Sequence, residues 1–159
     1  MHLQILAVGK VKEKFCQAGI AEYEKRLTPL CRFTIGEVAD EAVAEGAPEA
    51  LLAKARQKEG ERLLAKIPAD AYVIALAIEG KSLSSPAFAA HLEQLALSGK
   101  KEVIFLIGGS WGLAPAVLKR ADYALSFGAM TYPHQLMRLI LCEQIYRAFK
   151  INRHEPYHK

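Results

Sequence analysis

The stretches Tyr72-Val73-Ile74-Ala75-Leu76-Ala77-Ile78 and Val103-Ile104-Phe105-Leu106-Ile107 decide the fold class of this chain. Both are almost continuously apolar, which is typical of strands covered on both faces of a parallel sheet. Between them, Ser84-Ser85-Pro86 marks the start of a helix that ends at Gly99. This order predicts a right-handed βαβ unit and an α/β fold with a mostly parallel sheet.

The rest of the chain supplies further elements on both sides of this unit. We expect strands at Leu3–Val8, Arg32–Ala39 and Tyr123–Phe127, and helices at Glu13–Leu27, Pro48–Ile67 and Pro133–Ile151. No repeat, low-complexity stretch or linker separates them. With 159 residues, 52% hydrophobic and 24% charged, the chain is expected to form one globular domain over residues 1–159.

The expected last helix is apolar nearly all round. Its first half carries few polar side chains among Leu136, Met137, Leu139, Ile140, Leu141, Cys142, Ile145, Tyr146 and Phe149. Such a helix must be buried on several sides. Two arrangements satisfy this requirement: packing against a second copy in a homodimer, or a central position in the core of a monomer.

Cysteine usage and the N-terminus indicate a reduced, cytoplasmic protein. Cys16, Cys31 and Cys142 are widely spaced and odd in number, which favours neither a disulfide framework nor a zinc site. The apolar run before Gly9-Lys10 is short and no basic segment precedes it, so no signal peptide is expected. No apolar run approaches the roughly 18 residues of a membrane span.

The charge of the chain permits an anionic partner without requiring one. The net charge is +4 and the isoelectric point is about 9.0. Basic residues crowd the C-terminal segment, at Arg138, Arg147, Lys150, Arg153 and Lys159. A solvated surface and a nucleic-acid contact are both compatible with this clustering.

Two local patterns imitate nucleotide and zinc sites. Residues 75–82 come within one residue of the phosphate loop, but Ala75 replaces its first glycine and the next helix begins after Ser84 rather than at the lysine. His154-Glu155-Pro156-Tyr157-His158 matches a zinc-protease pattern by letter, yet Pro156 disrupts the helix that the pattern needs. Neither pattern is expected to function, and no metal is expected.

The run Gly108-Gly109-Ser110-Trp111-Gly112 follows a late strand, unlike the dinucleotide loop of a Rossmann fold. One interpretation is a tight turn that needs a positive φ. The other is a place where backbone approaches a flat ligand such as adenine.

Several motifs in fixed order resemble one family over essentially the whole chain. They are residues 104–109 with Gly112, then Leu125-Ser126 and Met130-Thr131-x-Pro133-His134, then Glu143-Gln144-x-Tyr146-Arg147-Ala148, and finally Pro156-Tyr157-His158. The family is RlmH, large-subunit ribosomal RNA methyltransferases of the SPOUT superfamily. The resemblance implies a homodimer and a SPOUT-type α/β knot, in which the C-terminal segment threads through a loop as a deep trefoil.

The resemblance also implies a cofactor site and an activity. S-adenosylmethionine would lie in the knot, held largely by backbone groups of three segments: Leu76, Gly108, and the run Phe127, Gly128, Ala129, Met130, Thr131 and Tyr132. The implied reaction is methylation of the N3 position of a pseudouridine in 23S, large-subunit rRNA, on assembled ribosomes. It needs no metal and no covalent enzyme intermediate, because the enzyme mainly positions donor and acceptor.

The tail and the C-terminal basic residues receive roles within this family. His158, held by Tyr157, is expected to orient the base or to accept the N3 proton, and Tyr157 to stack on the base. Arg138, Arg147, Arg153 and Lys159 are expected to contact the RNA backbone through charge. His134 is expected to cap or pack the last helix rather than to act chemically.

Two other functions remain open from the sequence. One is a SPOUT methyltransferase that acts on tRNA, although the chain has no added basic domain. The other is a dimeric RNA- or ribosome-binding module without catalysis.

Overall fold

Five parallel strands form one sheet in the order β2-β1-β4-β3-β5. The computed structural model describes residues 1–159. Its strands are β1 (His2–Val8), β2 (Arg32–Val38), β3 (Tyr72–Ser82), β4 (Glu102–Ile107) and β5 (Tyr123–Ser126). Its helices are α1 (Lys14–Leu27), α2 (Glu49–Leu64), α3 (Ser85–Leu97), α4 (Pro115–Arg120) and α5 (His134–Asn152). The predicted α/β class with a parallel sheet is confirmed.

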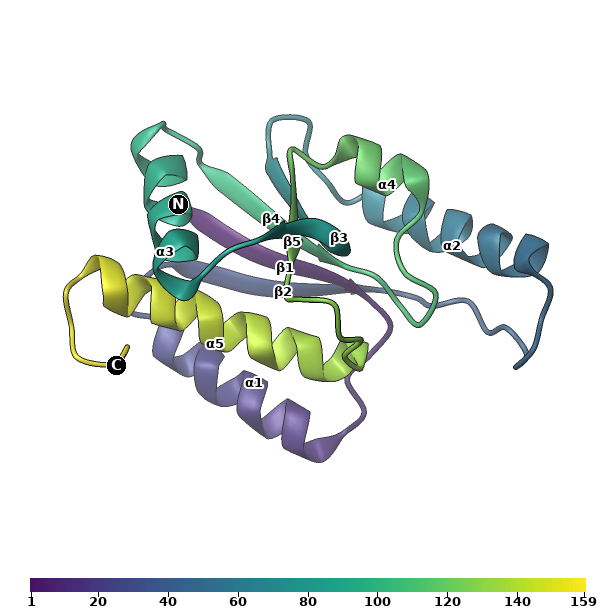
Figure 1. The fold of residues 1–159 in the computed structure, drawn as a ribbon, viewed down its shortest axis with the longest axis horizontal. Helices are drawn as coiled ribbons and strands as arrows, with labels where there is room; N and C mark the ends of the chain where they lie inside the picture. The colour runs from purple at the N-terminus through teal and green to yellow at the C-terminus, as the bar shows by residue number, and fades with distance from the viewer.

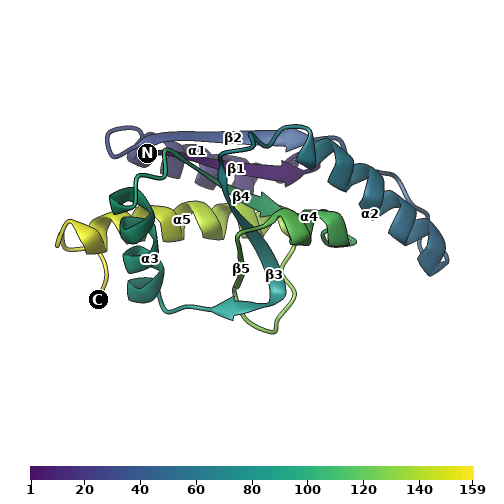
Figure 2. The same cartoon turned by 90° about the horizontal axis from the view of Figure 1, so that it is seen from above.

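Helices cover both faces of the sheet, as the continuous apolar strands predicted. On β1, Leu3, Ile5 and Ala7 belong to the larger core cluster, under α1, α3 and α5. Leu6 and Val8 point to the opposite face and join the smaller cluster, under α2 and α4. Figure 1 shows these two layers on either side of the sheet, and Figure 2 shows α2 projecting beyond it.

Strand β3 is longer than the sequence predicted and changes partner along its length. It pairs with β4 over Tyr72–Ala75 and with β5 up to Leu76. Lys81 then pairs with the same residue of β5, Leu125, so residues 77–80 are inserted without partners on that strand. At Gly80 the chain passes so close to β5 that a Cβ would lie 2.7 Å from the carbonyl carbon of Ala124.

Helix α4 was missed by the sequence prediction, which expected no helix between the strands at residues 103–107 and 123–127. It is six residues long and begins at Pro115, whose fixed φ suits the first turn of a helix. It buries Val117 against α2 and the sheet. Such a short helix depends on this packing, because isolated turns are not stable in water.

The structure confirms that both imitation motifs lack the geometry they need. Lys81 lies within β3, and α3 begins only at Ser85, so no helix N-terminus is present at that lysine. After α5 the chain leaves helical geometry at His154, whose φ is 54°. Residues 154–158 therefore do not form the helical turn of a zinc protease. None of the helices is long and apolar enough to cross a membrane.

Arg138 corrects one expectation, because its side chain is fully buried rather than presented to RNA. One Nη group donates to Glu37 at 2.8 Å, and the other donates to the carbonyl oxygens of Val8 and Gly9 at 2.8 and 2.9 Å. The guanidinium thus ties α5 to the ends of β1 and β2. It cannot reach an RNA phosphate without breaking these bonds.

Replacing Arg138 should destabilise the fold strongly. We expect Arg138→Leu to lower the free energy of unfolding by about 3 kcal/mol, because two buried carbonyl groups and Glu37 lose their partner. The exposed Arg153, changed to Leu, serves as the control and should shift stability by less than about 0.5 kcal/mol. Urea unfolding measures both values, and equal effects would contradict this role for Arg138.

Candidate functional site

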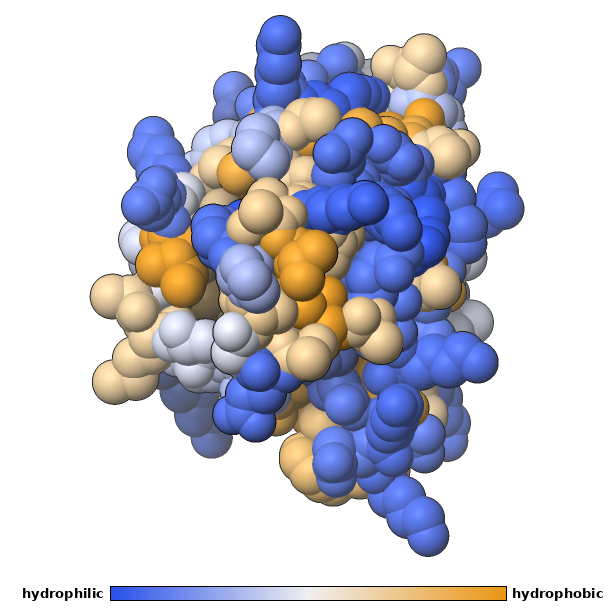
Figure 3. Space-filling view, turned by 90° about the vertical axis from the view of Figure 1, so that its right-hand side faces the viewer, coloured by the Kyte–Doolittle hydropathy of each residue, from blue (hydrophilic) through white to orange (hydrophobic).

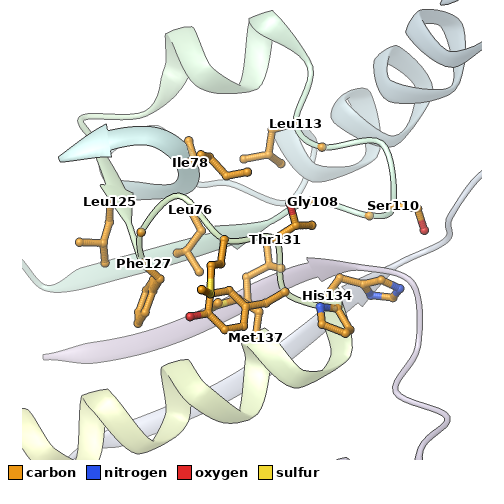
Figure 4. Close-up of a pocket in the computed structure, with 18 residues that line it drawn as sticks. Leu76, Ile78, Gly108, Ser110, Leu113, Leu125, Phe127, Thr131, His134 and Met137 are labelled. Carbon is orange, nitrogen blue, oxygen red and sulfur yellow. The ribbon is translucent and has the colours of Figure 1, made fainter. Parts of the chain in front are cut away.

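A cavity of ≈ 670 Å³ lies where β3, β4 and β5 end or break. Three segments line it: residues 76–78, residues 107–113 apart from Trp111, and residues 125–134 apart from Ser126 and Ala129, with Met137 of α5 added. Ligands of open parallel sheets bind outside the carboxyl ends of the strands, and this volume suits a small organic molecule. In Figure 4, Leu125 and Phe127 lie at one end of the cavity and Ser110 and His134 at the other.

The inserted residues of β3 form one wall of this cavity, and Ser126 fixes them in place. The buried Ser126 hydroxyl donates to the carbonyl oxygen of Ile78 at 2.8 Å. The Ser126 hydroxyl oxygen in turn accepts a hydrogen bond from the backbone N–H of Gly128 at 3.1 Å. One side chain therefore connects the insertion in β3 to the turn that follows β5.

The glycine run is both a tight turn and a cavity wall, so the two interpretations of it are compatible. Gly109 and Gly112 form an isolated antiparallel bridge, and Gly112 has a φ of 81°. A Cβ on Gly108 would lie 2.7 Å from the carbonyl carbon of Gly112, closer than real side chains approach backbone. The turn therefore excludes every other residue at position 108.

The structure brings together most of the residues expected to bind the cofactor. Those lining the cavity are Leu76, Gly108, Phe127, Gly128, Met130, Thr131 and Tyr132. Ala129 lies in the same segment but does not line the cavity. The sequence reasoning did not name Ile78, Leu125, Pro133 or Met137 as contributors. Pro133 directly follows Tyr132, and Ile78 and Leu125 lie two positions from residues that it did name.

The cavity interior is largely apolar, and His134 is its only side chain that normally titrates near neutral pH. Burial lowers the pKa of His134, and the charge of Arg138 lowers it further, against the opposing effect of Asp40. The imidazole is therefore neutral at pH 7. Nδ1 lies 3.5 Å from Nη2 of Arg138.

Exposed apolar side chains surround the cavity mouth. Met130 is 76% exposed, Ile78 is 55% exposed and Tyr132 is 38% exposed. Figure 3 looks onto this end of the molecule and shows apolar side chains near the middle of the face, bordered by hydrophilic ones. A face of this kind is typical of a binding surface.

The tail lies far from this cavity within one protomer. The Tyr157 hydroxyl donates to Glu143 at 3.1 Å and lies 3.2 Å from the Tyr23 hydroxyl. Nδ1 of His158 lies 3.3 Å from Nη1 of Arg147. Since Glu143 follows His134 by nine residues along α5, the tail is separated from the cavity by about 14 Å or more of helix. Figure 1 shows the C-terminus at the opposite end of α5.

The expected holding of His158 by Tyr157 is replaced by a cluster around Arg147. Nε and Nη2 of Arg147 donate to Glu143, and its guanidinium lies 4.7 Å from the Tyr157 ring centroid. Burial raises the pKa of Tyr157, and its hydrogen bonds to Tyr23 and Glu143 add to this effect. Tyr157 therefore remains a neutral phenol at physiological pH.

The other basic residues of the C-terminal segment differ in exposure. Arg147 is largely covered by its partners, whereas Arg153 and Lys159 are exposed. Neither Arg153 nor Lys159 forms an ion pair. Both can therefore meet a polyanion directly.

Glu59 of α2 is a residue that the sequence reasoning did not single out. It is 2% exposed and lies under the glycine run, with both carboxylate oxygens 3.5 Å from the position of a Cβ on Gly109. Oε1 accepts the backbone N–H of Glu41 at 3.0 Å, and burial raises the pKa of the carboxyl group. The four-residue spacing of the buried Ala55, Glu59 and Leu63 is the signal that places it inside.

Comparison with known proteins gives a consistent family. A model described as "Predicted SPOUT methyltransferase" matches residues 1–158. Proteins named ribosomal RNA large subunit methyltransferase H are 58% identical in Listeria monocytogenes and 57% identical in Bifidobacterium adolescentis, each over 100% of both chains. A protein of that name from an Exiguobacterium species is 56% identical, again over 100% of both chains.

A solved structure supports the fold at greater distance. The tRNA (m1G37) methyltransferase from Aquifex aeolicus superposes with a TM-score of 0.51 at 14% identity, covering 92% of this chain and 70% of that one. The match to the family model and the full-length relatives decide the assignment. The chain belongs to the SPOUT methyltransferases and, among them, to the family of relatives named ribosomal RNA large subunit methyltransferase H.

Proposed function

We propose that this protein uses S-adenosylmethionine to methylate N3 of a pseudouridine in large-subunit rRNA, on assembled ribosomes in the cytoplasm. The observation that carries this proposal is the cavity at the carboxyl end of the sheet, built by the segments that the family resemblance predicts. The substrate class rests on relatives of 55–58% identity over the whole chain whose names specify large-subunit rRNA. The deep trefoil knot that the family resemblance implies also remains a prediction.

The residues present suit S-adenosylmethionine. Gly108 borders the cavity with backbone alone, because the Gly112 backbone packs where a Cβ would lie, so a flat base can approach it closely. Leu76, Leu113 and Met130 offer apolar walls. When bound, the cofactor supplies an electrophilic methyl group on a sulfonium. The protein then contributes by holding the acceptor in line with that methyl group, which accounts for a large part of the barrier reduction in such reactions.

We also propose that the enzyme is a homodimer in which the tail of one protomer completes the cavity of the other. Tyr157 and His158 can serve the reaction only there, since their own cavity lies at the far end of α5. An uncharged hollow of ≈ 330 Å³ beside the cavity, lined in part by Phe127, Ile140 and Gln144, suits protein rather than RNA. In this arrangement Tyr157 stacks on the base and His158 accepts the N3 proton.

The exposed cations of the C-terminal segment complete the proposal. Arg153 and Lys159, with Arg147 at the tail, would meet RNA phosphates near the acceptor base. Arg138 has no part in this contact because it is buried. Such contacts strengthen binding without reading sequence, so specificity would come from the shape of the ribosome.

Radiolabelled S-adenosylmethionine tests the reaction directly. Incubation with ribosomes that lack this methyl group should label one pseudouridine of the large-subunit rRNA. Label on tRNA instead would favour the other SPOUT activity. Absence of label from every RNA, with a folded protein, would contradict methylation and favour a binding module.

The glycine turn provides a test of the cofactor site. We expect Gly108→Ala to weaken S-adenosylmethionine binding by about tenfold or more, because its Cβ meets backbone that cannot move aside. Gly109→Ala is the matched control, since its Cβ meets only side-chain atoms: Val8 at 3.1 Å and the Glu59 carboxylate oxygens at 3.5 Å. Isothermal titration measures both affinities, and equal effects at the two positions would contradict the proposed wall.

Mixed dimers test whether the tail acts on the other protomer. Gly108→Ala damages the cavity, and the double variant Tyr157→Ala/His158→Ala damages the tail. With S-adenosylmethionine below its wild-type Kd, each homodimer should therefore keep about a tenth of the wild-type rate or less. Co-expression should restore roughly a quarter of the wild-type rate, because half of random dimers are mixed and each has one intact composite site. No restoration would show that each tail serves its own protomer or none.

A further inference from the structure

A second hollow, of ≈ 370 Å³, adjoins the cavity at the carboxyl ends of β1 and β2. Its lining comes from residues 9–12 apart from Val11, residues 37–40, and the start of α5 at His134 and Gln135. The main cavity and this polar hollow share His134. A methyl acceptor must lie next to its donor, and a hollow that shares a wall residue with the cofactor cavity meets this requirement.

The loop that forms this hollow is held in a defined position. The backbone N–H groups of Lys12 and Glu13 both donate to Oε1 of Gln135, at 2.7 and 3.0 Å. The buried Arg138 donates a hydrogen bond to the carbonyl oxygen of Gly9. The loop of the hollow is therefore fixed to α5, the helix that also contributes His134 and Met137 to the cavity.

The charges of the polar hollow suit one nucleotide of RNA. Lys10 and Lys12 are exposed and form no ion pair, so they are free to meet phosphate. Of the two carboxylates, Glu37 is neutralised by Arg138. Asp40 remains free and offers an acceptor for a ribose hydroxyl, the group that distinguishes RNA from DNA.

The surroundings of His134 fix which ring nitrogen carries its proton. Arg138 faces Nδ1, and a guanidinium can only donate, so Nδ1 is the acceptor and the neutral ring carries its hydrogen on Nε2. A neutral imidazole in this tautomer donates a hydrogen bond rather than accepting a proton. In a pseudouridine, N3 lies between two ring carbonyl groups, and the negative charge left on losing the N3 proton spreads onto their oxygens.

We infer that the polar hollow is the acceptor-nucleotide subsite, with Lys10 and Lys12 on the phosphate and Nε2–H of His134 on a ring carbonyl oxygen next to N3. This rests on the proposed function. The N3–H proton passes to a base, the N3 electron pair forms the bond to the methyl carbon, and the carbon–sulfur bond breaks with its electrons left on sulfur. His134 keeps its own proton and stabilises the charge that develops on the carbonyl oxygen.

The lysines are tested by ribosome affinity rather than by turnover. Lys10→Ala/Lys12→Ala should raise the Kd for undermethylated ribosomes by about tenfold and lower the salt slope by about two, with affinity for S-adenosylmethionine unchanged. Lys101→Ala/Lys119→Ala removes the same charge from exposed positions, just before β4 and in the last turn of α4. This control should change neither the Kd for ribosomes nor the salt slope. Equal weakening by both double variants, or by neither, would overturn the subsite.

The donor role of His134 is tested by a pair of substitutions under single-turnover conditions. His134→Ala should slow methyl transfer by about 100-fold with ribosomes and S-adenosylmethionine saturating, as loss of one such donor does elsewhere. His134→Gln retains an N–H donor and should recover most of that rate. If Gln were as slow as Ala while binding S-adenosylmethionine normally, the donor role would be overturned. Wild-type protein that bound ribosomes without methylating them would overturn the proposed function, and this inference with it.

Discussion

The site depends on one interruption in an otherwise regular parallel sheet. Leu76 and Lys81 of β3 both pair with Leu125 of β5, so the chain between them must leave the ladder. Because both faces of the sheet are covered by helices, the displaced residues can go only toward the open carboxyl edge. There they form one wall of the cavity, and the buried Ser126 hydroxyl holds them against the turn after β5.

Helix α5 separates the two groups of residues that we propose take part in the reaction. Its first residue, His134, borders both the cavity and the polar hollow, whereas Glu143 and Arg147 hold the C-terminal tail further along. A rigid helix of 19 residues cannot bring these ends together within one chain. A composite site in a dimer reconciles this separation with the tail's proposed part in catalysis. It also gives a reason for the apolar side chains exposed around the cavity mouth.

Much of the fold could be predicted because the buried strands are continuous apolar runs with clear helix signals between them. The end of β3 could not, since Glu79-Gly80-Lys81-Ser82 is polar and only Lys81 and Ser82 return to pair with β5. Helix α4 could not be predicted either, because six residues are too few to show the helical spacing of apolar side chains. In both cases tertiary contacts decide the local structure, and a sequence window does not contain them.

The residues of the site likewise divide into those that the sequence predicted and those that depend on tertiary contacts. The cavity segments were predicted from ordered motifs, and all of the expected residues except Ala129 line the cavity. Arg138 was assigned by its charge, although it shares the buried face of α5 with Cys142 and Ile145, at spacings of four and seven residues. For Arg138, its place on the buried face of α5 predicts its environment better than its charge does. The distance between tail and cavity could not be read from the sequence, because it depends on the turn after α5, which lays Tyr157 and His158 against Glu143 and Arg147.

A crystal structure of the protein grown with S-adenosylmethionine tests the central claim most directly. We predict one ligand in each chain's cavity, against the backbone at Leu76, Gly108 and residues 127–132, with the tail of a second protomer at the cavity mouth. A ligand bound elsewhere, or a cavity closed off by the protein's own dimer contacts, would contradict the account.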